Sequence, residues 1–143
     1  MPNLHPFLVP FPIALLAATF ILELIGLGRP SPDFTRAGWW TQLLGSFGLA
    51  AAVLSGILAK GAARLEAAGA SLLDTHEEVA FLNAGIFSFL LLWRVAAKTN
   101  LPQNHRTWYL LLFAAGVVTL CAGAWVGGEL VYGFGAGVAR PLQ

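Results

Sequence analysis

The sequence carries little charge. Only 10% of its 143 residues are Asp, Glu, Lys or Arg, and the formal net charge is +1, whereas about a quarter of the residues in a soluble domain are charged. This shortage excludes an ordinary water-soluble domain, and the near-neutral balance excludes nucleic acid as a partner. The chain is instead 57% hydrophobic, with a mean hydropathy of +0.73. It is therefore predicted to be a membrane protein that contacts lipid.

Cysteine and catalytic motifs are also nearly absent. The lone Cys121 cannot form an internal disulfide, and a thiol among aliphatic side chains is typical of a small hydrophobic residue. No nucleophile stands beside a base, and no glycine-rich phosphate loop is present. The middle of each apolar segment lacks the ionisable residues of transporters and channels. We therefore do not expect this chain to be an enzyme on its own.

Four apolar segments are long enough to cross a bilayer, which takes about 20 helical residues. They cover residues 8–27, 38–59, 79–97 and 108–132. Because the connections are short, residues 1–143 are predicted to form a single transmembrane domain, an all-α integral membrane four-helix bundle. Small residues recur at helical spacing within the spans, which favours close helix packing.

Basic residues predict the orientation of the bundle. Five flank the loops after the first and third segments, namely Arg29, Arg36, Arg94, Lys98 and Arg106, against Lys60, Arg64 and Arg140 on the other side. The richer side is expected to be cytoplasmic, so both termini would lie on the outer side. Aromatic residues are expected at the cytoplasmic interface, where such rings settle: Trp39, Trp40, Trp93, Trp108 and Tyr109.

The first segment opens with His5 and three prolines in HPFLVPFPIALL, residues 5–16. Proline is tolerated in a first helical turn, where its missing N–H would have no partner. We expect a rigid lead-in followed by a helix from about Pro10. Such a lead-in would hold His5 in a defined place at the outer membrane face.

A second histidine lies in SLLDTHEEVAFLNAG, at the start of the third segment. Thr75 and Glu78 have the spacing of a capping box, which predicts that the helix begins at His76. Asn83 would then share the face of His76. Because the first and third segments run in the same direction, His5 and His76 are predicted to lie at the same membrane surface.

Two histidines at one end of a bundle suit axial ligation of a b-type haem. Asn83 would lie beside such a cofactor, and four rings could pack on it: Phe7, Phe81, Phe87 and Phe134. The alternative is a pair of ordinary interfacial histidines. A metal site is not expected, because Glu129 falls on the face of Trp125, opposite Gly127.

The other polar residues suggest structural roles. Glu23 lies inside the cytoplasmic end of the first segment, where a carboxylate should face protein or water. It is expected to pair with Arg94 or to hydrogen-bond to Trp39, with a proton relay as the alternative. His105 lies on the cytoplasmic side, away from the other two histidines.

Three stretches resemble an uncharacterised four-helix bacterial membrane family, known as a domain of unknown function. They are HPFLVPFPIALL, THEEVAFLNAG and GAWVGGELVYGFGAGV. Family members typically carry two further histidines, where this chain has Pro10 and Phe134. Some are fused or adjacent to Rieske iron-sulfur or cytochrome modules, which implies a place in electron transfer in the bacterial inner membrane.

Two hypotheses stand from this reading. In the first, the protein is an accessory subunit without a redox centre, and its partners are other membrane subunits of a respiratory or photosynthetic complex. In the second, it is a b-type cytochrome subunit with His5 and His76 as haem ligands. The two missing histidines favour the first, since phenylalanine keeps the bulk of an imidazole but cannot ligate.

Overall fold

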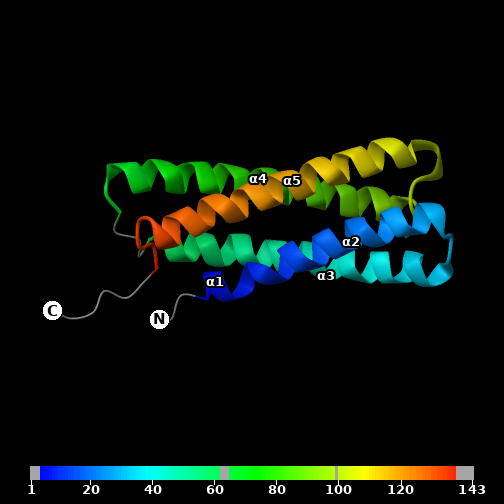
Figure 1. Cartoon of the computed structure of the whole chain (residues 1–143), viewed down its shortest axis with the longest axis horizontal. Helices are drawn as coiled ribbons and strands as arrows, with labels where there is room; N and C mark the ends of the chain where they lie inside the picture. Colours follow the sequence, from blue (N-terminus) through cyan, green and yellow to red (C-terminus); the bar gives the residue numbers. More distant parts are fainter. Residues whose placement is uncertain (1–3, 62–64, 99, 138–143) are drawn as a thin grey trace.

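The computed structural model describes residues 4–61, 65–98 and 100–137, and these contain helices but no strand (Figure 1). The elements are α1 (His5–Leu8), α2 (Pro10–Gly28), α3 (Pro32–Lys60), α4 (Ala67–Ala96), the 3-10 turn η1 (Gln103–His105) and α5 (Arg106–Tyr132). Taking α1 and α2 as one span, four helices of the described chain are long and apolar enough to cross a membrane. The predicted all-α membrane bundle is confirmed.

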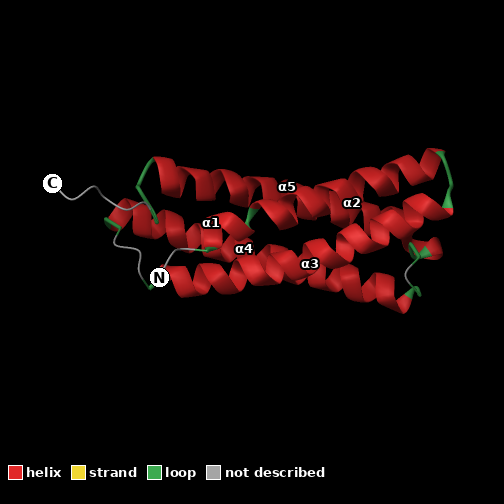
Figure 2. Ribbon diagram, turned by 90° about the horizontal axis from the view of Figure 1, so that it is seen from below, coloured by secondary structure: helices red, strands yellow, loops and turns green. Residues whose placement is uncertain are grey.

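The helices pack as two antiparallel hairpins, α2 with α3 and α4 with α5. The hairpins close into a bundle through contacts of α3 with α4 and of α2 with α5 (Figure 2). Within the described residues the backbones of α2 and α4 do not come close to one another, so these two helices lie diagonally across the bundle. The short α1 lies against α3 and continues into α2. The beginnings of α1 and α4 therefore lie at the same end of the molecule.

The proline-rich opening is more helical than expected. The long helix α2 begins at Pro10 as expected, but the lead-in before it is itself helical from His5, and Val9 between α1 and α2 has helical φ and ψ of −55° and −40°. The Val9 N–H still donates to the His5 carbonyl at 3.1 Å. Because proline fixes φ near the helical value, the prolines remove hydrogen bonds here without bending the chain out of the helix.

The third span also begins earlier than the predicted capping box. Thr75 lies inside α4, and its hydroxyl donates to the Ser71 carbonyl at 3.2 Å, as in the interior of a helix. Asp74 and Glu77 pair with Lys60 of α3 instead of capping a helix. The preceding residues 67–73 are alanine, leucine, glycine and serine, which a helix accepts, so nothing ends the helix before Thr75.

The second span begins at Pro32 rather than at residue 38. Ser31 is its N-cap, and the Ser31 Oγ accepts a hydrogen bond from the Asp33 N–H at 3.2 Å. Pro32 follows in the first helical position, where proline is favoured. This Ser-Pro-Asp pattern is a start signal that hydropathy alone does not detect.

The core lies in the middle of the bundle and draws on all four spans. Its buried hydrophobic residues include Leu16, Leu49, Phe87, Leu90, Tyr109, Phe113 and Leu120. The Phe113 ring lies 5.3 Å from the Phe87 ring and 6.0 Å from the Tyr109 ring. Tyr109 is fully buried, so its predicted place among the interfacial aromatics is wrong. Its hydroxyl donates to Gln42 at 2.8 Å, and this interior partner makes the burial possible.

Candidate functional site

His5 is held at the start of α1 by the backbone of α3. Its Nδ1 lies 2.9 Å from the Ala52 carbonyl oxygen and 3.2 Å from the Ser55 Oγ. A carbonyl only accepts, so Nδ1 carries the proton and donates, which makes Nε2 the nitrogen with the lone pair in the neutral ring. The ring also lies on Gly56, where an added Cβ would be 3.1 Å from its Cε1. Ala52, Ser55 and Gly56 together fix the position and the tautomer of His5.

His76 lies against α5 in a comparable way. Gly127 provides the space for its ring, since a Cβ there would be 3.0 Å from Cε1. The ring also lies near the backbone of Gly123. Nδ1 is shielded from solvent and has no well-aligned hydrogen-bond partner in the described part of the chain. Each histidine thus rests on a glycine of a neighbouring helix, His5 on α3 and His76 on α5.

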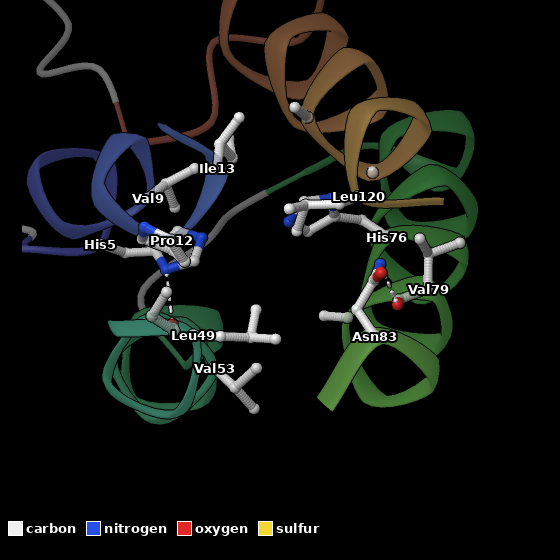
Figure 3. Close-up of a pocket in the computed structure, with 14 residues that line it drawn as sticks. His5, Val9, Pro12, Ile13, Leu49, Val53, His76, Val79, Asn83 and Leu120 are labelled. Atoms are coloured by element: carbon white, nitrogen blue, oxygen red, sulfur yellow. Dashed lines mark hydrogen bonds between the residues drawn. The ribbon is translucent and has the colours of Figure 1, made fainter. Parts of the chain in front are cut away.

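The structure brings the two imidazoles together. Their ring centroids are 6.2 Å apart, and their planes are nearly perpendicular, at 80°. Figure 3 shows the rings pointing toward one another across the interior, His5 from α1 and His76 from α4. Because α1 leads into α2, which lies diagonally opposite α4, the pair faces inward from two sides of the bundle.

A small cavity extends from the histidines into the bundle. Its volume is about 60 Å³, and its other walls are apolar apart from Asn83; they include Val9, Pro12, Leu49, Val79 and Leu120 (Figure 3). The Asn83 side chain already has two hydrogen-bond partners. Its side-chain N–H donates to the Val79 carbonyl at 2.9 Å, and its Oδ1 accepts from the Thr119 hydroxyl at 2.9 Å. Asn83 therefore braces the wall of the cavity.

The site fits the axial ligands of a haem but not the macrocycle. Two imidazoles about 6 Å apart suit opposite sides of one ion, with metal–nitrogen bonds near 2.0 Å. A cavity of about 60 Å³ holds a few water molecules, and a plane of four pyrrole rings is several times larger. As the helices are packed, the histidines can share an ion, but a porphyrin cannot enter between them.

The phenylalanines expected around a haem lie elsewhere. Phe7, Phe81 and Phe134 are 67%, 50% and 38% exposed, and Phe87 is buried against Phe113 in the core. None of the four lines the cavity. Helical spacing places Phe87 on the face of His76, but three further turns of helix carry it past the site and into the middle of the bundle.

A second polar cluster lies toward the opposite end of the bundle. The Arg94 side chain is fully buried, and its Nη1 lies 2.7 Å from the Glu23 Oε1. Nη1 also donates to the Gln42 Oε1 at 2.9 Å, and Nη2 donates to the Thr35 carbonyl at 3.2 Å. With the Tyr109 hydroxyl on the same Gln42 oxygen, the cluster joins α2, α3, α4 and α5. Of the two partners expected for Glu23, the structure provides Arg94.

The remaining candidates lie away from the histidines. Glu129 is exposed, on the same side of α5 as Trp125, which is 80% exposed. Cys121 is exposed on α5 as well. His105 ends η1, 22 residues before Gly127, which is about 30 Å along a helix. None of these three residues lines the cavity beside His5 and His76.

Sequence reasoning missed the residues that support the histidines. The sequence predicts Ala52, Gly56 and Gly127 only as small residues of packing stripes, whose glycines could also leave room for a cofactor, and it does not single out Ser55. One signal was available, since each glycine lies near the end of a span that antiparallel pairing places beside a histidine. The specific contacts, a carbonyl for His5 and a glycine under each ring, depend on helix rotation and could not be deduced from spacing.

Comparison with known proteins agrees with a membrane bundle of this kind. A family described as "Predicted membrane protein (DUF2231)" matches residues 1–140. No curated protein and no solved structure matches the chain. Because the match covers nearly the whole sequence, the chain belongs to the DUF2231 family of predicted membrane proteins.

Proposed function

We propose that the protein is an accessory subunit of a larger electron-transport complex in the bacterial inner membrane. The assignment to electron transport rests on the resemblance to family members found beside Rieske or cytochrome modules. The assignment as a subunit rests on the surface that the described chain presents. That surface is mostly helix flank, because the described loops are short.

The polar interior is the observation that carries this proposal. Ionisable residues inside a membrane usually mark a transport path or a proton relay. Here Glu23 and Arg94 neutralise one another, with Gln42 and Thr35 as further partners. The cluster therefore links the helices to one another. Contacts with other molecules are then made by the apolar outer flanks of the bundle.

The exposed flanks offer large side chains on several helices. On α5 these are Trp108, Leu111, Val118 and Trp125, and on α3 they are Leu44, Phe47, Leu54 and Leu58. In a bilayer such residues face either lipid or a partner helix. The partner of this proposal is an apolar transmembrane helix of another subunit, with lipid covering the remaining flanks.

Site-specific photo-crosslinking in native membranes tests the proposal. A photoreactive residue replaces Val118 on α5 in one variant and Leu54 on α3 in another. We expect one flank to yield a stoichiometric partner that co-purifies in mild detergent, while the other flank yields lipid adducts. If both flanks give only lipid adducts and the chain purifies alone, the accessory-subunit proposal is wrong.

The convergence of His5 and His76 favours a second candidate, a b-type haem subunit. The 6.2 Å ring separation supports it, and the size of the cavity opposes it. A reduced-minus-oxidised spectrum of protein purified from native membranes separates the candidates. Sharp b-haem bands that disappear in His76→Ala would establish the haem, whereas a flat spectrum from folded protein would remove it.

A further inference from the structure

We propose that His5 and His76 bind a single copper(I) ion between α1 and α4. This site goes beyond the role of an accessory subunit, which needs no bound ion. The proposal starts from the arrangement of the two rings, which point toward each other across the interior (Figure 3). It then rests on their separation, on the groups that hold them, and on the number of ligands within reach.

The separation of the rings equals that of two imidazoles on one ion. A metal–nitrogen bond of about 2.0 Å, with a further ~1.1 Å from the nitrogen to the ring centre, places two opposed rings about 6 Å apart. The observed centroid separation is 6.2 Å. The angle of 80° between the planes is compatible with linear coordination, because rotation about a metal–nitrogen bond leaves the bond unchanged.

His5 is prepared as a ligand by its surroundings. A metal-binding histidine characteristically donates its other N–H to a carbonyl or carboxylate, which fixes the tautomer and orients the ring. The Nδ1 hydrogen bond of His5 to the Ala52 carbonyl is an interaction of this kind, and Ser55 adds a second contact. Ligation would therefore use Nε2 of His5.

The Nδ1 of His76 is buried, and the ring lies near the backbone of Gly123 on α5. The ring is also held in place, because Gly127 lies directly against it. An ion between the two histidines would give the His76 ring a partner on the side of His5.

The ligand count selects the ion. No group of three or more His, Cys, Asp or Glu residues capable of holding a metal occurs in the described ranges. Zinc and iron take four or more ligands, which this apolar pocket does not supply. Copper(I) has a filled d shell and accepts two imidazoles in a linear arrangement.

Charge favours the same ion. The cost of taking an ion out of water rises with the square of its charge, so a monovalent ion costs about a quarter of what a divalent one does. The two neutral imidazoles bring no negative charge to compensate, and the cavity behind them is lined by hydrophobic residues. Copper(I) therefore suits the site better than copper(II) or zinc.

Anaerobic titration of the full-length protein in lipid nanodiscs tests the site. Copper(I) is supplied from its complex with the chromophoric chelator bicinchoninate, and we expect one ion to transfer per chain. His5→Ala and His76→Ala should each weaken binding by more than about 100-fold, since even outer-shell changes at metal sites cost 10–100-fold. His105→Ala is the matched control and should leave binding unchanged.

Three further measurements test the site, and the first uses only the wild type, so it does not depend on the folding of a variant. X-ray absorption of the copper(I)-loaded wild type should show two nitrogen neighbours at about 2 Å. His76→Met should retain copper(I), because a thioether is a soft ligand. Ser55→Ala should weaken copper(I) binding by about 10-fold through the loss of a second contact to His5.

Three outcomes would overturn the copper site. The first is folded wild type that takes no copper(I) from the chelator. The second is His5→Ala and His76→Ala variants that bind it as well as the wild type. The third is a haem bound by both histidines in protein from native membranes. None of these results contradicts the accessory-subunit proposal, which depends on crosslinking to a partner.

Discussion

Arg94 shows how a single residue can join a membrane bundle. Its side chain has no solvent exposure and contacts Glu23 of α2 together with Gln42 and Thr35 of α3. Burying such a charge is costly unless its partners remain in place. The energetic role of the cluster is therefore tested best by removing one partner at a time.

We predict that Glu23→Ala lowers the free energy of unfolding by about 3–5 kcal/mol, because it leaves the Arg94 charge buried without its carboxylate. Reversible unfolding in mixed detergent micelles measures the change. The exposed Glu78→Ala is the control and should stay within about 0.5 kcal/mol of the wild type. The double variant Glu23→Leu with Arg94→Met should lose less than Glu23→Ala alone, and a larger loss would contradict this account.

A second prediction concerns the wall of the cavity. Thr119→Val removes the hydroxyl that donates to the Asn83 Oδ1, and a buried oxygen without a donor costs about 1–3 kcal/mol. The same unfolding measurement applies. Thr75→Val is the control, since the Thr75 hydroxyl is exposed and donates only to a carbonyl of its own helix. Equal losses in the two variants would show that Asn83 does not depend on Thr119.

Prediction from the sequence succeeded for a charged residue that must have a partner inside the membrane. Glu23 in an apolar span requires a partner, and Arg94 is one of two candidates that the loop geometry allows. Tyr109 could not be placed correctly, because a tyrosine near a span end is equally at home at the interface or inside. Its burial depends on Gln42, and the rotation of α3 that brings Gln42 inward is not visible in the sequence.

At the scale of elements, glycine sets how closely α2 and α3 approach. A Cβ at Gly45 would lie 2.8 Å from the Leu16 Cγ, which is closer than an ordinary contact, where α2 and α3 pack against one another. In lipid, where apolar contact gains little from water exclusion, this close packing is a main source of helix association.

We predict that Gly45→Ala destabilises the protein by about 1–3 kcal/mol through overpacking against Leu16. Gly85→Ala is the matched control, because a Cβ at that mid-helix position would meet nothing within 4 Å. Gly85→Ala should be neutral or stabilising by up to about 1 kcal/mol. Thermal unfolding in the same detergent compares the two, and equal effects would refute the packing argument.

Hydropathy located the four spans but not their true ends. The apolar stretch of the third span begins near Val79, yet α4 begins at Ala67, three turns earlier. Those turns place His76 inside a helix and against Gly127, instead of at an exposed cap. Propensity could have extended the helix, because residues 67–73 contain no proline. The capping-box pattern also occurs inside many helices, and it placed the predicted start of this helix too late in the sequence.

At the scale of the whole molecule, the predicted orientation depends on few charges. Arg94 is buried in its ion pair, so the basic residues that flank the two sides number four and three: Arg29, Arg36, Lys98 and Arg106 against Lys60, Arg64 and Arg140. The excess still favours both termini on the outer side.

We predict that alkaline phosphatase fused after Gln143 is active and that green fluorescent protein fused there is dark, as expected for an outer C-terminus. Fusions after Gly28, at the end of α2, should give the reverse. Replacing Arg29 and Arg36 with glutamine should reduce this asymmetry, because these residues supply half of the cytoplasmic charge. A fluorescent C-terminal fusion in otherwise unchanged protein would invert the topology and place the paired histidines on the cytoplasmic side.

The cluster around Arg94 also bears on how the chain is assembled during synthesis. Glu23 and Gln42 belong to the first hairpin and are translated before Arg94. The acceptors are therefore synthesised before the cation, and the second hairpin pairs its buried charge only by docking on the first. Separating the two hairpins would leave the Arg94 charge, in the last turn of α4, without its carboxylate partner. A charge that would hinder a lone helix thus becomes the reason for two hairpins to stay together.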